Sequence, residues 1–98
     1  MYEFEWDDQK EQVNIRKHGL DFSEASTVFY DDNARIIGDP DHSVDEDRFI
    51  ILGLSTSMKV LVVCHCYRES ETIIRIFSAR KATKSEEKGY WSFYEKRV

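Results

Sequence analysis

Cationic side chains gather in one short stretch near the end of the sequence, and their chemistry suits a phosphate group. Arg75, Arg80 and Lys81 lie in this stretch, which ends at Lys84. Arg75 stands between two isoleucines, so a strand would turn it away from the face that they bury. Arg80 and Lys81 come just before an expected helix, whose N-terminus attracts anions. We predict that these arginines and lysines hold a phosphate, the alternative being a solvated strand face.

Two histidines stand where they can transfer protons, because the pKa of histidine lies near neutrality. His18 ends the expected first helix. His65 lies in an apolar run, and strand alternation puts it on the face opposite Cys64 and Cys66. The alternative for His65 is a structural histidine with satisfied ring nitrogens. Whether it faces Arg75 depends on the hairpin register, which the sequence does not determine.

The first helix carries a further polar face. Four residues share it at helical spacing: Lys10, Asn14, Lys17 and His18. They are either the wall of a binding site or an ordinary solvated helix face. Arg48, at the start of a strand, can join the site or form a structural ion pair with Glu46.

A metal site is not expected. Cys64-His65-Cys66 has ligand residue types, but a strand turns His65 away from both thiols, and no second ligand pair follows. The acidic loop at 39–47 contains His42 but lacks the glycine spacing of a calcium loop. We therefore predict neither a metal nor another cofactor.

The charge of the chain is divided between its halves. Residues 1–47 carry 14 acidic and 4 basic side chains, whereas residues 48–98 carry 5 acidic and 10 basic ones. One surface can therefore bind a polyanion although the net charge is −5.

The length of 98 residues predicts one domain, 1–98. Two closely spaced cysteines, an acidic N-terminus and no membrane-length apolar stretch favour the cytoplasm.

Hydrophobic periodicity and capping residues predict an α+β domain. The expected elements are a strand at 4–6, helices at 8–18 and 24–30, strands at 34–38, 48–55, 59–67 and 72–80, and a final helix at 84–97. Asp7 and Asp8 can both cap the first helix. Glu11 follows Asp8, and Glu86 follows Thr83, at the spacing of a capping box. Ser23 is expected to cap the second helix. The aromatic face of the last helix, which runs from Tyr90 to Val98, should pack on the sheet.

Several segments, taken in order, resemble the BrnT family of bacterial toxins. They are Phe4-Glu5-Trp6-Asp7, Asn14 with Lys17-His18-Gly19, Phe22 with Glu24-Ala25 and Val28-Phe29, Asp41-His42-Ser43, Glu46 with Arg48-Phe49, Gly53, Ile74-Arg75-Ile76, Ser78-Ala79-Arg80-Lys81-Ala82-Thr83, Glu86 and Tyr90. The resemblance spans nearly the whole chain, from about residue 4 to residue 94.

This resemblance implies a RelE-like fold, in which an antiparallel sheet of about four strands is packed by N-terminal helices and a C-terminal helix. It also implies a type II toxin–antitoxin ribonuclease that cuts RNA without a bound metal. A BrnA-type antitoxin would neutralise it, and the complex would bind operator DNA through the antitoxin.

The residues and the resemblance together favour a metal-independent endoribonuclease. Arg80, Lys81 and Arg75 would stabilise the scissile phosphate, and His65 or His18 would transfer protons. The remaining cations and one amide would bind RNA: Lys10, Asn14, Lys17, Arg48 and Lys84. The alternative is a non-catalytic protein-binding module or corepressor that acts only with a DNA-binding antitoxin.

Overall fold

The computed structural model describes residues 2–39, 47–69 and 71–97. The elements, in chain order, are β1 (Glu3–Glu5), α1 (Asp8–His18), α2 (Phe22–Thr27), the 3₁₀ helix η1 (Val28–Tyr30), β2 (Arg35–Gly38), β3 (Arg48–Leu54), β4 (Val60–Arg68), β5 (Ile73–Lys81) and α3 (Lys84–Arg97). The predicted α+β class and element order are confirmed. Among the described helices, none is both long and apolar enough to span a membrane.

The strands form one sheet in the order β1-β5-β4-β3-β2, and four of them make the expected antiparallel run. The predicted strand number and sheet type were nevertheless wrong, because β1 joins as a fifth strand, parallel to β5. Phe4 lies opposite Ile74 in this pairing. The sequence indicates the strand at 4–6, but its partner lies some seventy residues away, beyond the reach of local patterns.

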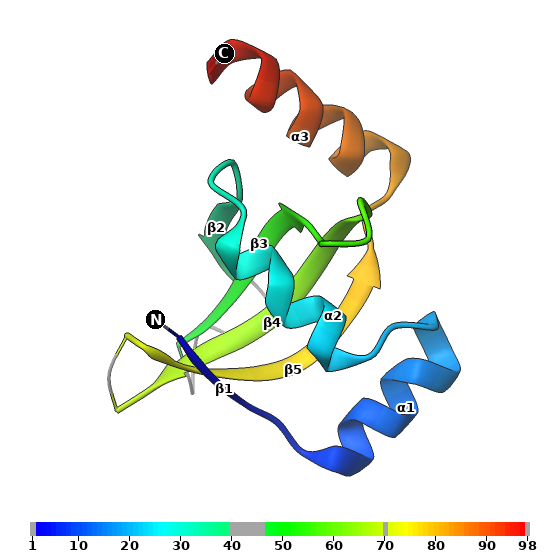
Figure 1. The fold of residues 1–98 in the computed structure, drawn as a ribbon, viewed down its shortest axis with the longest axis vertical. Helices are drawn as coiled ribbons and strands as arrows, with labels where there is room; N and C mark the ends of the chain where they lie inside the picture. Colours follow the sequence, from blue (N-terminus) through cyan, green and yellow to red (C-terminus); the bar gives the residue numbers. More distant parts are fainter. Residues whose placement is uncertain (1, 40–46, 70, 98) are drawn as a thin grey trace.

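One face of the sheet carries the hydrophobic core, and α2 with η1 covers it (Figure 1). The core residues are Leu20, Phe22, Ala25, Val28, Phe29, Ile51, Leu61, Val63, Ile74, Ile76 and Ala79. The strand residues among them alternate along β4 and the first half of β5, as the sequence predicts. The other face, which we call the pocket face, carries Ile50, Val62 and Cys64.

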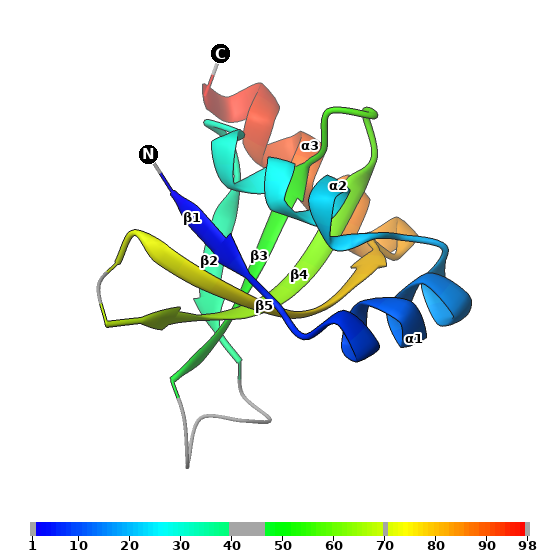
Figure 2. The ribbon, with the colours of Figure 1, turned by 60° about the horizontal axis from the view of Figure 1, so that its bottom comes forward.

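Helix α1 lies beside β5, past the point where β1 ends (Figure 2). Its buried Asn14 donates from Nδ2 to the carbonyl oxygens of Ala79 at 2.9 Å and Leu20 at 3.0 Å. The amide of Ala79 donates to Asn14 Oδ1 at 3.0 Å. The side-chain amide therefore pairs with the edge of β5 as a neighbouring strand would.

The helix ends agree in part with the predicted caps. Gly19 ends α1 with a φ of 70°, and Thr83 and Glu86 form the expected capping box. Of the two aspartates that were expected to cap α1, Asp7 does so, and the predicted box of Asp8 with Glu11 is therefore wrong. The Glu11 carboxylate accepts from the backbone N–H of Phe22 at 2.9 Å, which ties α1 to the start of α2.

The second helix also begins earlier than predicted. Asp21, rather than Ser23, caps it and accepts from the Glu24 amide at 2.7 Å. The segment then tightens into a 3₁₀ helix at Val28. The predicted apolar stripe of Ala25, Val28 and Phe29 is nevertheless buried.

Helix α3 lies beyond the ends of the strands, near β2 (Figure 1). Buried Tyr90 donates to Asp31 Oδ2 at 2.7 Å, and the guanidinium of Arg35 lies 5.0 Å from the Phe93 ring centre. A cavity of about 300 Å³ remains between its first turns and the strands. Of the aromatic face that was predicted to pack on the sheet, Tyr90 is buried, but its hydrogen-bond partner Asp31 lies before β2. The contact with β2 itself is made by Phe93, which was not assigned to that face, and Val98 lies outside the described residues.

Replacing Asn14 by Ala should lower the free energy of unfolding by about 3 kcal/mol, because buried backbone groups lose their partners. Chemical denaturation measures this change. Gln12→Ala, at an exposed position of the same helix, is the control and should cost less than about 0.5 kcal/mol. Similar losses in both variants would contradict the role given to Asn14.

Candidate functional site

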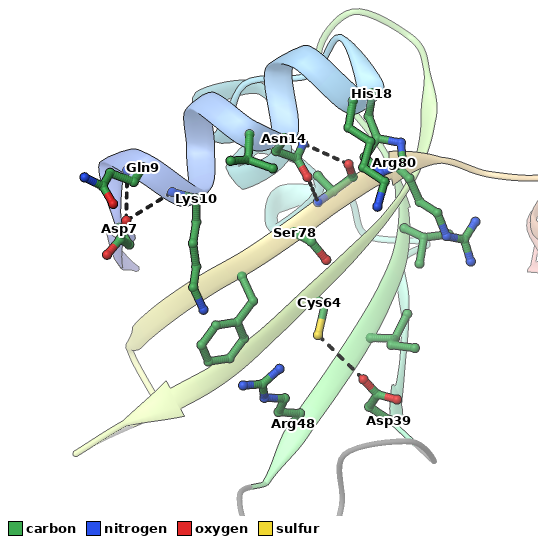
Figure 3. A pocket seen from close by; sticks show the side chains of 16 residues that line it. Asp7, Gln9, Lys10, Asn14, His18, Asp39, Arg48, Cys64, Ser78 and Arg80 are labelled. Carbon is green, nitrogen blue, oxygen red and sulfur yellow. Dashed lines mark hydrogen bonds between the residues drawn. The ribbon is translucent and has the colours of Figure 1, made fainter.

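A hollow of about 750 Å³ lies on the pocket face, between α1 and the strands (Figure 3). It is lined by Asp7, Gln9, Lys10, Val13, Asn14, Lys17, His18, Asp39, Arg48, Ile50, Val62, Cys64, Phe77, Ser78, Ala79 and Arg80. We call this hollow the central pocket. Helix α1 forms its wall and β3, β4 and β5 form its floor, so its shape depends on how α1 is attached to β5.

A β-bulge determines which β5 side chains enter the central pocket. Cys64 pairs with Ser78 and His65 pairs with Ile76, so Phe77 is an extra residue on β5. Strict alternation would have buried Ser78 and Arg80 together with Ile76. The extra residue shifts the pattern, so Phe77, Ser78 and Arg80 all line the pocket.

The pocket brings together cations that are far apart in the sequence. Lys10, Lys17 and His18 come from α1, Arg48 from β3 and Arg80 from β5. Both lysines and His18 belong to the acidic half of the chain, residues 1–47. The division of charge along the sequence therefore does not correspond to a division of surfaces, because folding places α1 beside the basic strands.

An aromatic ring lies among these cations. The guanidinium carbon of Arg48 is 4.1 Å from the ring centre of Phe77, and Lys10 Nζ is 5.2 Å from it. At these separations both cations are attracted by the ring. Phe77 therefore holds two long, flexible side chains in defined places.

Arg80 is held by α3. Its two terminal nitrogens donate to the two carboxylate oxygens of Glu86 at 2.7 and 3.0 Å. This contact lowers the pKa of Glu86 to about 2 and raises that of Arg80. The Arg80 side chain nevertheless remains 41% exposed, so it is not sealed off from the pocket by this contact.

A buried carboxylate lies at the end of the central pocket away from His18 (Figure 3). Asp39, which is 5% exposed, accepts a hydrogen bond from the Cys64 thiol, with 3.6 Å between Oδ2 and sulfur. Burial, together with the charge of Asp39, raises the pKa of Cys64 to about 11. The thiol therefore stays protonated and acts as a donor.

His65 lies on the opposite face of the sheet, in the core, so the structure does not bring it to the central pocket. Its ring centre is 4.7 Å from that of Phe29. Nδ1 donates to the Val63 carbonyl at 3.2 Å, and Nε2 accepts from the Tyr67 hydroxyl at 3.3 Å. Burial lowers the pKa of His65 to about 4, so the imidazole is neutral at pH 7. These contacts correspond to the structural alternative.

Three other predicted cations lie apart from the central pocket. Arg75 shares the pocket face but lies further along β5, with a nitrogen 3.8 Å from a Glu5 carboxylate oxygen. Lys81 pairs with Leu61 and therefore belongs to the opposite face. Lys84 is exposed in the first turn of α3.

Neither Phe77 nor Asp39 was given a site role from the sequence, whereas Asn14 was assigned a direct role in binding. Phe77 enters through the bulge, and Asp39 follows β2, and neither feature has a local signal in the sequence. Asn14 lines the pocket, but its amide is bonded to backbone groups. The predicted partner of Arg48, Glu46, and the loop histidine, His42, lie outside the described residues.

The fold and the central pocket together define a class: a small α+β protein whose sheet carries a cation-lined pocket suited to a phosphate-bearing ligand. The family model described as "Ribonuclease toxin, BrnT, of type II toxin-antitoxin system" matches residues 6–86. The chain therefore belongs to the BrnT family of ribonuclease toxins, which confirms the predicted resemblance.

A solved structure supports the same fold. The crystal structure of the ribonuclease toxin BrnT from Brucella abortus superposes with a TM-score of 0.65 and 23% sequence identity. The match covers 86% of this chain and all of the Brucella chain. A search of curated proteins found no match.

The contact between Arg80 and Glu86 should make stability depend on pH. Because the folded-state pKa of Glu86 is about 2 against an ordinary value of 4.5, its ionised form stabilises the fold above about pH 4.5, and this stabilisation is lost as the pH falls through 2. The difference in unfolding free energy between the protein and Glu86→Gln should stay constant near neutrality and shrink in acid. Glu87→Gln, at the exposed neighbouring position, is the control. If the difference in unfolding free energy between the protein and Glu86→Gln persisted at pH 2, it would contradict this account.

Proposed function

We propose that this protein is an endoribonuclease toxin that cleaves RNA in the central pocket without a bound metal. The observation that supports this function most is the convergence of Lys17, His18 and Arg80 on one hollow. Cations offset the charge that grows on phosphorus during cleavage, and a histidine moves protons at neutral pH. Membership of a family of ribonuclease toxins points to the same reaction.

The proposed reaction uses the ribose 2′-OH as its nucleophile. The 2′-OH gives its proton to solvent water while its oxygen attacks the neighbouring phosphorus. The bond to the 5′-oxygen then breaks, and a 2′,3′-cyclic phosphate and a 5′-OH are formed. Arg80 and Lys17 would stabilise the negative charge of the phosphorane, and His18 would give a proton to the leaving 5′-oxygen. DNA lacks the 2′-OH, so the activity should be confined to RNA.

The other cations of the central pocket would bind the RNA. Lys10 and Arg48 contribute charge beside Phe77, and Asn14 holds α1 in place as the wall of the pocket. His65, Arg75, Lys81 and Lys84 lie elsewhere, so the proposal gives them no part in the chemistry.

The partners follow from the family and from the resemblance noted in the sequence. A type II toxin acts with a protein antitoxin, and we propose that this antitoxin is of the BrnA type. We also propose that the complex binds operator DNA through the antitoxin, and that the fold is of the RelE-like kind.

Cleavage of labelled RNA in excess chelator tests the function. Replacing Arg80 or His18 by Ala should lower the cleavage rate by about 100-fold or more, because each removes a group that acts on the transition state. Arg75→Ala is the matched control, since it removes an arginine from the same strand outside the central pocket, and it should keep most of the activity. Equal losses at Arg75 and Arg80 would contradict the assignment of this pocket.

The same variants separate the enzyme from the alternative of a non-catalytic binding module. An enzyme predicts that Arg80→Ala stops growth inhibition while binding to the antitoxin is retained. A binding module predicts that growth inhibition and antitoxin binding are lost together. Growth assays and co-purification with the antitoxin give these two readouts.

A further inference from the structure

The end of the central pocket that holds Asp39 differs in chemistry from the end that holds His18. Phe77 lies there on a bulge, with the guanidinium of Arg48 stacked 4.1 Å from its ring centre. Bulges commonly redirect one side chain beside a functional site. Unpaired bases of RNA stack on aromatic rings and on arginine planes. The Arg48–Phe77 stack therefore suits the flat face of a base better than it suits a phosphate.

Asp39 gives this end of the pocket a hydrogen-bond preference. An ionised carboxylate only accepts hydrogen bonds, and its two oxygens have about four acceptor positions. The protonated thiol of Cys64 uses one position on Oδ2, and Asp39 has other contacts besides this one. A negative charge here repels phosphate, so a ligand that contacts Asp39 must present donors.

We propose that Asp39, Arg48 and Phe77 form a nucleobase subsite that selects guanine beside the scissile phosphate. Guanine presents two adjacent donors on its Watson–Crick edge, N1–H and the N2 amino group, whereas the other three bases present a donor next to an acceptor there. The carboxylate of Asp39 accepts from both donors, and the base lies against the Arg48–Phe77 stack. This inference rests on the proposed ribonuclease function.

The layout of the pocket is consistent with one nucleotide bound across it. His18 lies at one end, and Asp39 and Arg48 lie at the other (Figure 3). A guanine at the Asp39 end would leave its ribose and phosphate directed toward Lys17 and Arg80. The position of the base would then determine which phosphate is cleaved.

Modified RNAs test the subsite without changing the protein. The substrates are otherwise identical oligonucleotides that carry guanosine, inosine or 7-deazaguanosine at one position, assayed free and in a translating extract. Inosine lacks the N2 amino group, so kcat/KM should fall about tenfold or more, as expected when a charged acceptor loses a donor. The 7-deazaguanosine substrate keeps the Watson–Crick edge and should be cleaved like guanosine.

Protein variants test the residue that reads the base. Asp39→Asn replaces one acceptor by a donor, so the ratio of guanosine to inosine cleavage should fall close to one. Asp7→Asn is the matched control, because the Asp7 carboxylate lines the same pocket but is bonded to the start of α1, and it should keep the ratio. Phe77→Leu should raise KM by about tenfold, because base stacking is lost while an apolar side chain remains.

The outcomes separate this inference from the proposed function. Cleavage at guanosine that weakens with inosine and loses this preference in Asp39→Asn supports the subsite. Cleavage with no base preference, or with preference for another base, overturns the subsite and leaves the ribonuclease function intact. If the unaltered protein cleaves none of the RNAs under either condition, both proposals fail.

Discussion

The carboxamide of Asn14 occupies the place beside β5 that a neighbouring strand would otherwise fill. β1 pairs with only the first residues of β5, so the backbone of Ala79 needs another partner. Asn14 supplies both a donor and an acceptor to that residue. A buried edge without partners would be costly, and this bond therefore determines where α1 lies. Since α1 is the wall of the central pocket, the candidate site depends on the same contact.

The β-bulge at Phe77 is the second constraint, because it divides the arginines of β5 from the core. Before the bulge the isoleucines Ile74 and Ile76 face the core, and after it Ala79 does. One extra residue thus keeps apolar side chains inside along a nine-residue strand and places Arg80 in the pocket. A regular strand with this sequence would have buried Arg80, at a high cost in desolvation.

Contacts with neighbouring side chains limit the freedom of the cations in the central pocket. Glu86 holds Arg80 through two hydrogen bonds while also capping α3, and Phe77 gives Arg48 and Lys10 a fixed surface. Side chains that are already ordered lose less entropy when a ligand binds. The cations of the pocket are therefore ordered before an anion binds. A bound anion would contact Arg80 alongside Glu86.

The sequence by itself determined the elements, the family and most of the cations of the site. Helix caps, apolar alternation and turn residues act over a few positions, so the bounds of α1, β4 and α3 were predicted to within one residue. The tertiary structure decided which of the predicted residues meet. β1 pairs with β5, the bulge at Phe77 lies opposite β4, and Asp39 contacts Cys64. Each of these contacts joins residues that are distant along the chain. A shift of one residue in strand register reverses every face, so local patterns cannot settle such contacts. His65 shows this limit, because alternation correctly gave its face, but only the packing of α2 and η1 made that face the core.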